Sequence, residues 1–76
     1  MSYKVILDDM STIKRFVSLT QDMSESVTLS SGRYIIDGKS ILGILSLDLS
    51  RPVTMTIDSQ NDYDELFKDF LYKEEK

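Results

Sequence analysis

Apolar residues recur with two different spacings along this chain, and the order of those spacings limits the folds open to it. In residues 53–57 they alternate with polar residues, which predicts a strand with one solvated face. In another segment they lie three and four residues apart, which predicts an amphipathic helix over about residues 11–22. The residues at this helical spacing are Ile13, Phe16, Val17 and Thr20. A sheet with one face covered by a helix is the simplest fold that satisfies both patterns.

Three more segments have the pattern of strands. At the beginning of the chain, Tyr3, Val5 and Leu7 alternate with Lys4 and Ile6, which suits a half-buried strand. Residues 26–30 and 33–36 are rich in residues that favour strands, and the turn-forming pair Ser31-Gly32 lies between them. These two segments are therefore expected to form a β-hairpin.

Two further segments complete the order of elements. Residues 39–47 are short and very apolar, and periodicity alone leaves open whether they form a buried strand or a helix of about two turns. After Asn61, a plausible N-cap, comes the strongest helical stripe of the chain, which predicts a final helix. The stripe consists of Tyr63, Leu66, Phe67, Phe70 and Leu71. Residues 1–76 are therefore predicted to form one α+β domain, an open sandwich.

The composition excludes several classes of protein. The 76 residues include no cysteine and no histidine, which rules out disulfides, thiolate zinc sites and Ser-His-Asp triads. No metal site or cofactor is expected, because the carboxylates have no tight ligand spacing and the scattered glycines form no phosphate-binding loop. Since no nucleophile with an activating base can be named, we expect that the protein is not an enzyme.

Charge and hydropathy restrict the partners and the location. The formal net charge is -4 and the basic residues are scattered, so nucleic acid is not an expected partner. No apolar stretch reaches the length of a membrane span, and the first residues do not have the pattern of a signal peptide. We therefore expect a cytoplasmic protein without membrane insertion.

Residues 38–47, with the sequence GKSILGILSL, resemble the regulatory segment of HPr, the phosphocarrier protein of the bacterial phosphoenolpyruvate:sugar phosphotransferase system. In that family, Lys-Ser is followed by two apolar residues, a glycine, two more apolar residues and Ser-Leu. Residues 27–36 align with the HPr hairpin without gaps, and residues 53–57 resemble the strand that follows. The resemblance implies an open-faced β-sandwich of order β-α-β-β-α-β-α. A four-stranded antiparallel sheet would then carry two longer helices and one short helix, residues 39–47, on one face.

The chain departs from HPr at the phosphorylated histidine. In HPr, the loop after the first strand carries glycine, an apolar residue, the histidine, alanine, arginine and proline, whereas residues 8–15 are shorter and have no histidine, glycine or proline. Ser11 or Thr12 cannot replace the histidine, because their phosphates are stable esters that do not pass the group on. Asp8 or Asp9 could form an acyl phosphate, but two acids before a helix are expected to be capping residues. Lys14 and Arg15 are expected on a solvated helix face.

Ser40 is the candidate regulatory phosphorylation site. The resemblance aligns it with the serine that HPr kinase phosphorylates in the HPr of many Gram-positive bacteria. A phosphate at a helix start, beside Lys39, would lie near unpaired backbone N–H groups and the positive end of the helix dipole. The alternative is that Ser40 is simply the N-cap of the short helix.

The apolar residues after Ser40 are too numerous for a two-turn helix with one buried face. They are Ile41, Leu42, Ile44, Leu45 and Leu47. The resemblance implies that Ile41, Leu42 and Leu45, with Lys39, form an exposed patch that docks on enzyme I, sugar permeases and regulators. The alternative is a short helix buried on both sides in a homodimer.

These observations predict an HPr-like protein that cannot carry phosphohistidine and acts as a regulatory or protein-docking module in the control of sugar transport. Its expected partners are proteins, namely enzyme I, HPr kinase or a transcriptional regulator. The alternative is a structural or oligomerising module that keeps the HPr fold and has no phosphotransferase role. A stable homodimer that buries Leu42 and Leu45 would favour this alternative.

Overall fold

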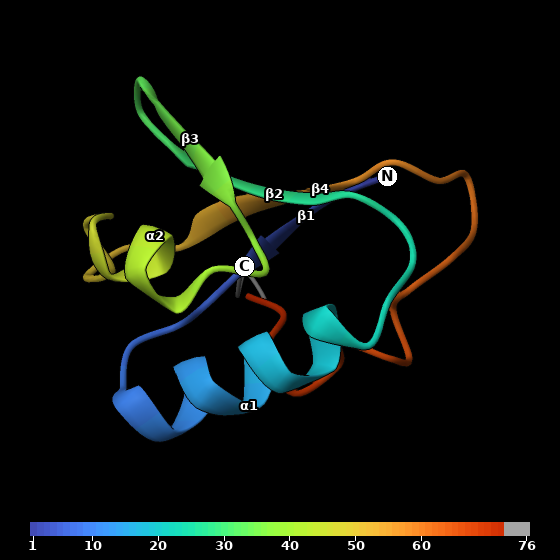
Figure 1. Ribbon diagram of the computed structural model, residues 1–76, viewed down its shortest axis with the longest axis horizontal. Helices are drawn as coiled ribbons and strands as arrows, with labels where there is room; N and C mark the ends of the chain where they lie inside the picture. The colour runs from blue at the N-terminus through green and yellow to red at the C-terminus, as the bar shows by residue number, and fades with distance from the viewer. Residues whose placement is uncertain (73–76) are drawn as a thin grey trace, which may run out of the picture.

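The computed structural model describes residues 1–72 and contains a four-stranded antiparallel sheet with two helices (Figure 1). In chain order the elements are β1 (Ser2–Val5), α1 (Met10–Gln21), β2 (Val27–Ser31), β3 (Tyr34–Asp37), α2 (Ile41–Leu45) and β4 (Val53–Ile57). The predicted α+β fold and the four strands are confirmed. Residues 73–76 of the expected domain lie outside the described residues. None of the helices within residues 1–72 has the length and apolar character needed to cross a membrane.

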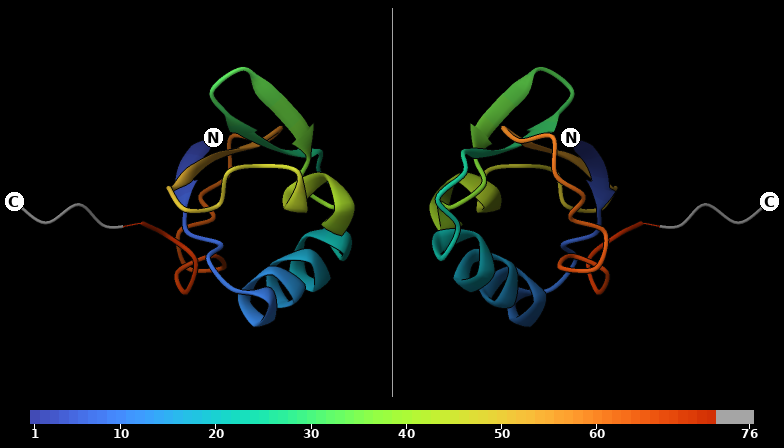
Figure 2. Two further views of the ribbon diagram at one scale, coloured as in Figure 1. Left: turned by 90° about the vertical axis from the view of Figure 1, so that its left-hand side faces the viewer. Right: turned by 90° about the vertical axis from the view of Figure 1, so that its right-hand side faces the viewer.

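The sheet has the strand order β1-β4-β2-β3, so that β4 lies between the first two strands of the chain. Met55 of β4 pairs with Tyr3 on one side and with Leu29 on the other. Val53, Met55 and Ile57 are buried, as their alternation with polar residues predicts. Figure 2 shows both helices and the chain after β4 on the same side of the sheet, so the core lies between these two layers.

Helix α1 begins at Met10, one residue before the predicted start, and ends at Gln21. All four residues of the predicted stripe are buried against the sheet: Ile13, Phe16, Val17 and Thr20. Thr20 is the one polar residue among the buried side chains of the described chain, and its hydroxyl lies 3.0 Å from the Gly38 carbonyl oxygen. This hydrogen bond ties the helix to the segment that leads into α2 and satisfies a polar group that burial would otherwise leave without a partner.

The segment 39–47 contains a short helix, Ile41–Leu45, and no strand. The hydroxyl of Ser40 accepts a hydrogen bond from the Gly43 N–H at 3.1 Å, which caps the first turn. Ile44 and Leu47 are buried, while Leu42 is 79% exposed, as expected of a helix at the surface. The HPr resemblance implied this outcome, which the apolar pattern alone left open.

The predicted final helix does not form, and this corrects the expected number of helices to two within the described chain. Residues 64–70 are a series of turns with one α-helical hydrogen bond, from the Phe67 N–H to the Tyr63 carbonyl at 3.0 Å. Tyr63, Phe67 and Phe70 are nevertheless buried, and Phe70 packs edge-on against Phe16 of α1. The apolar spacing therefore predicted the core residues correctly and the backbone conformation wrongly.

Long-range backbone pairing explains why the helix does not form. The Phe70 carbonyl accepts a hydrogen bond from the Ile6 N–H, and the Tyr72 N–H donates to the Lys4 carbonyl, both at 2.8 Å. These bonds lay residues 70–72 against β1 and give partners to groups on the outer edge of that strand. A helix continued through Phe70 and Tyr72 would leave this edge unpaired, so tertiary pairing overrides the local helical preference.

Gly38 and Gly43 are expected to respond oppositely to replacement by alanine. A Cβ on Gly38 would lie 2.7 Å from the Val27 Cγ1 atom and 3.1 Å from the Val27 carbonyl oxygen, whereas a Cβ on Gly43 meets atoms at ordinary contact distance, 3.4 Å or more. Gly38→Ala is therefore expected to lower the free energy of unfolding by about 1–3 kcal/mol. Gly43→Ala, within α2, should raise it by up to about 1 kcal/mol. Urea denaturation of both variants tests this. A Gly38→Ala variant with the same free energy of unfolding as the parent chain would contradict the close contact between Gly38 and Val27.

Candidate functional site

Helix α2 is held by hydrogen bonds at both ends. The Ser40 N–H donates to the Asp37 carbonyl at 3.1 Å, and the Ser40 hydroxyl caps the helix. At the other end, the Ser46 hydroxyl donates to the Gly43 carbonyl at 2.6 Å. Ser40 is half-buried, and its present role is that of an N-cap. A phosphate on its hydroxyl would stand at the start of a five-residue helix.

Three of the four predicted docking residues lie together on α2. Leu42 is 79% exposed and Leu45 is 44% exposed, while Ile41 is half-buried and packs against the core. We call these three residues the α2 surface. Ile44 is fully buried, and residues two apart lie on nearly opposite sides of a helix, so Leu42 cannot turn inward without removing Ile44 from the core.

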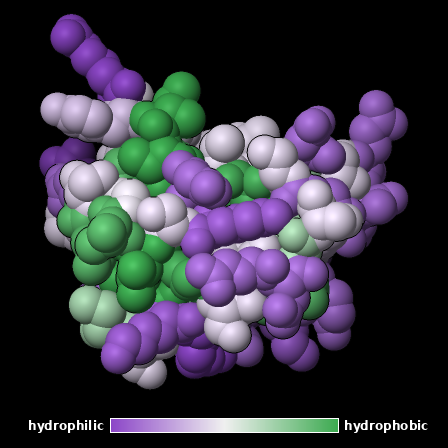
Figure 3. All heavy atoms as spheres, viewed as in Figure 1, coloured by the Kyte–Doolittle hydropathy of each residue, from purple (hydrophilic) through white to green (hydrophobic). Residues whose placement is uncertain are grey.

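The apolar region continues from α2 onto β3. Ile36 packs against α2, with its Cβ 3.4 Å from the position that a side chain on Gly43 would occupy. Tyr34 and Ile35, the two preceding residues of β3, are 71% and 72% exposed. Figure 3 shows hydrophobic atoms gathered over α2 and the neighbouring end of β3, and mainly polar atoms on the rest of this face.

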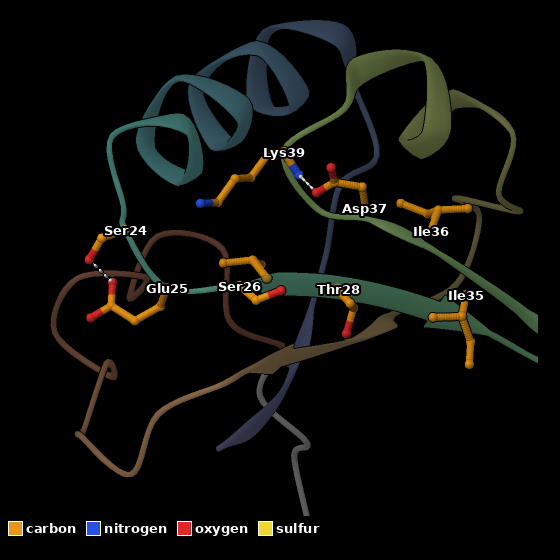
Figure 4. A pocket seen from close by; sticks show the side chains of 9 residues that line it. Ser24, Glu25, Ser26, Thr28, Ile35, Ile36, Asp37 and Lys39 are labelled. Atoms are coloured by element: carbon orange, nitrogen blue, oxygen red, sulfur yellow. Dashed lines mark hydrogen bonds between the residues drawn. The ribbon is translucent and has the colours of Figure 1, made fainter.

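Lys39 does not join the α2 surface. Its backbone N–H donates to the Asp37 carboxylate at 2.9 Å, and its ammonium donates to the Met23 carbonyl at 2.6 Å. In Figure 4 the side chain extends away from α2 and toward the chain that leaves α1. Lys39 therefore ties two loops together, and its charge lies away from the Ser40 hydroxyl.

An open depression of about 600 Å³ lies beside Lys39 (Figure 4). It is lined by Ser24, Glu25, Ser26, Val27, Thr28, Ile35, Ile36, Asp37 and Lys39. Its charged groups already have partners within the protein: the Glu25 carboxylate, for example, accepts hydrogen bonds from the hydroxyls of Ser24 and Tyr63. A hydrogen bond from a backbone N–H is the main cause that lowers the pKa of Glu25, and the hydrogen bond from the Tyr63 hydroxyl lowers it further.

The N-terminus of α1, which the sequence resemblance aligns with the histidine loop of HPr, is occupied by structural contacts. The Asp9 carboxylate accepts a hydrogen bond from the Thr12 N–H at 2.7 Å, so Asp9 is the N-cap, as its position before the helix predicts. This hydrogen bond lowers the pKa of Asp9. Arg15 forms an exposed ion pair with Asp69 at 3.4 Å and lies over the Phe70 ring. Arg15 therefore joins α1 to the last segment of the fold.

Asp9→Ala is expected to lower the melting temperature by a few degrees at neutral pH, because the first turn of α1 loses its cap. The pKa of Asp9 is lower in the folded protein than in the unfolded chain, so its contribution to stability is complete above the unfolded pKa and is lost as the pH falls through the folded pKa. The difference in melting temperature between Asp9→Ala and the parent chain should therefore shrink in acid, below a pH of about 4. Asp8→Ala is the matched control, and an equal effect of the two variants would contradict the assignment.

The described residues offer no group of three histidine, cysteine, aspartate or glutamate side chains that could hold a metal ion. No protein-family model matches the chain, and neither does any curated protein. The strong exposure of the Tyr34 and Ile35 side chains was not predicted from the sequence. The three consecutive apolar residues Tyr34 to Ile36 carried a signal for Ile35 alone, because successive residues of a strand face opposite sides and Ile35 therefore lies on the other side of β3 from Tyr34 and Ile36.

Proposed function

We propose that this chain is an HPr-like protein of the bacterial phosphotransferase system that acts by binding other proteins. In this proposal it is a cytoplasmic regulatory or docking module, has no enzymatic activity, and takes no part in phosphohistidine transfer. The observation that carries the proposal is the α2 surface, where two leucines of a short, capped helix stand exposed next to the candidate phosphorylation site Ser40.

The element order from β1 to β4 supports the HPr-like part of the proposal. A strand, a helix, a hairpin, a short helix and a fourth strand follow one another as the resemblance implies, although the expected last helix is replaced by turns. The complete lack of histidine supports the loss of the carrier step. Of the two carboxylates considered for an acyl phosphate, Asp8 and Asp9, that of Asp9 is already engaged with the Thr12 N–H.

The proposal is tested by titrating the purified chain into enzyme I, HPr kinase and a transcriptional regulator of sugar use in separate calorimetric experiments. Saturable binding to at least one of them is expected. A parallel incubation with phosphoenolpyruvate and enzyme I should leave no acid-labile phosphate on the chain, because no imidazole is present to carry it. Absence of binding to all three proteins would contradict the proposal, and so would an acid-labile phosphate on the chain.

We expect HPr kinase to phosphorylate the chain once, on Ser40. The phosphate would add negative charge at the start of α2, beside the α2 surface, and so change which partners bind. Ser40→Ala should abolish labelling and also lower the free energy of unfolding by about 1 kcal/mol, because α2 loses its N-cap. Ser46→Ala, at the other end of α2, is the matched control and should be labelled like the parent chain. Label that persists in Ser40→Ala, or no label in the parent chain, would contradict the assignment.

A further inference from the structure

β3 is the open edge of the sheet. The strand order ends with β1 on one side and β3 on the other. The outer side of β1 is partly paired with residues 70–72, through the bridge between Val5 and Leu71 and the hydrogen bonds on either side of it. No element of the described chain runs along the outer side of β3, which Figure 2 shows at the rim of the molecule. An open strand edge is a template for pairing with another strand.

The hydrogen-bond pattern of the hairpin identifies the groups that β3 presents outward. The Gly38 N–H donates to the Val27 carbonyl at 2.8 Å, so these two residues form a hydrogen-bonded pair that extends the hairpin register. Hydrogen-bonded pairs alternate along an antiparallel ladder, so Ile36 and Tyr34 also bond to β2. The N–H and C=O of Ile35 therefore point away from the sheet.

The sequence around Ile35 is complementary to itself when two copies run antiparallel. If Ile35 stands opposite Ile35 of a second copy, its outward N–H and C=O form two hydrogen bonds across the contact. In that register Arg33 stands opposite Asp37 of the second copy, and the symmetry repeats this opposite-charge pair. Tyr34 stands opposite Ile36, an aromatic and β-branched pair of the kind that stabilises neighbouring strands. Charge, hydrogen bonding and apolar contact thus agree on one register.

We propose that two copies of this chain associate through antiparallel pairing of their β3 edges, with the two-fold axis at Ile35. The pairing joins two four-stranded sheets into one continuous sheet. It places the exposed side chains of Tyr34 and Ile35 beside those of the neighbouring β3 strand. The contact involves only a four-residue strand and its flanks, so the dimer belongs to the small, reversible class of interfaces. The inference is independent of the proposed function, which rests on α2.

Charge reversal tests the register. Sedimentation velocity up to millimolar concentration should show a reversible monomer–dimer equilibrium for the parent chain. Arg33→Glu and Asp37→Lys each place like charges opposite one another twice in the dimer, so each should lower the association constant about tenfold or more. An equimolar mixture of the two variants restores both opposite-charge pairs, and heterodimers should form with an affinity close to that of the parent dimer.

The mixture also controls for folding. The Asp37 carboxylate accepts a hydrogen bond from the Lys39 N–H, so circular dichroism must first show that Asp37→Lys is folded. Heterodimers in the mixture could not form from a misfolded variant. Leu42→Glu should leave the dimer unchanged, because the α2 surface lies outside the contact. A parent chain that stays monomeric, a mixture without heterodimers, or a dimer lost in Leu42→Glu but kept in Arg33→Glu would overturn the proposal.

Discussion

Phe67→Ala is expected to lower the free energy of unfolding by about 3–5 kcal/mol, the range found when a buried phenylalanine is truncated. Phe67 is fully buried, and its ring contacts those of Phe16, Tyr63 and Phe70. Its removal would leave a cavity between α1 and the last segment of the fold. Since whole domains have stabilities of about 5–15 kcal/mol, the variant should be close to unfolding. Urea denaturation followed by circular dichroism measures the effect.

Leu66→Ala is the matched control for this prediction. Leu66 precedes Phe67 in the same run of turns and is 49% exposed, so its truncation should change the free energy of unfolding by less than about 1 kcal/mol. Phe67→Leu, which keeps an apolar side chain at the site, provides a milder variant if Phe67→Ala does not fold. Equal effects of Phe67→Ala and Leu66→Ala would show that residues 61–72 do not pack as described.

Leu42→Glu is expected to weaken binding to whichever phosphotransferase-system protein the parent chain binds by at least about tenfold. The leucine would be desolvated in the contact, and burying a carboxylate without a partner there is strongly unfavourable. The free protein should be little affected, because Leu42 is 79% exposed. Calorimetric titration gives the affinity, and thermal denaturation of the variant shows that its fold is intact.

Leu66→Glu provides the comparison for binding. It introduces the same charge at a leucine that is 49% exposed, in the segment after β4, which lies apart from α2 in Figure 1. Its affinity for the partner should stay within about a factor of two of the parent value. If Leu66→Glu weakened binding as much as Leu42→Glu, net charge and not the α2 surface would be responsible.

Most of the fold could be predicted from local patterns. The stripe of α1 and the alternation in β4 each repeat over several residues, and the structure buries the residues that they select. The final helix was predicted wrongly because a helical spacing of apolar residues only requires that they be buried. The hydrogen bonds from residues 70–72 to β1 span more than sixty positions in the sequence, and no local pattern carries information about them.

The candidate site was predictable where a short segment determines its geometry. The Ser40 cap and the exposure of Leu42 both follow once residues 41–45 are helical, because the four large apolar side chains of this helix cannot all lie on one face. The direction of Lys39 was not predictable in the same way. Its ammonium bonds to the Met23 carbonyl, a group that comes near Lys39 only when α1 packs against the sheet.

The most direct test of docking through α2 is an NMR titration of the isotope-labelled chain with unlabelled enzyme I, and separately with HPr kinase. The amide signals of residues 40–46, which include the α2 surface, should shift or broaden with at least one of them. Signals of the same chain around Leu66 should remain unchanged. Changes confined to the N-terminus of α1, or no changes with either protein, would contradict docking through α2.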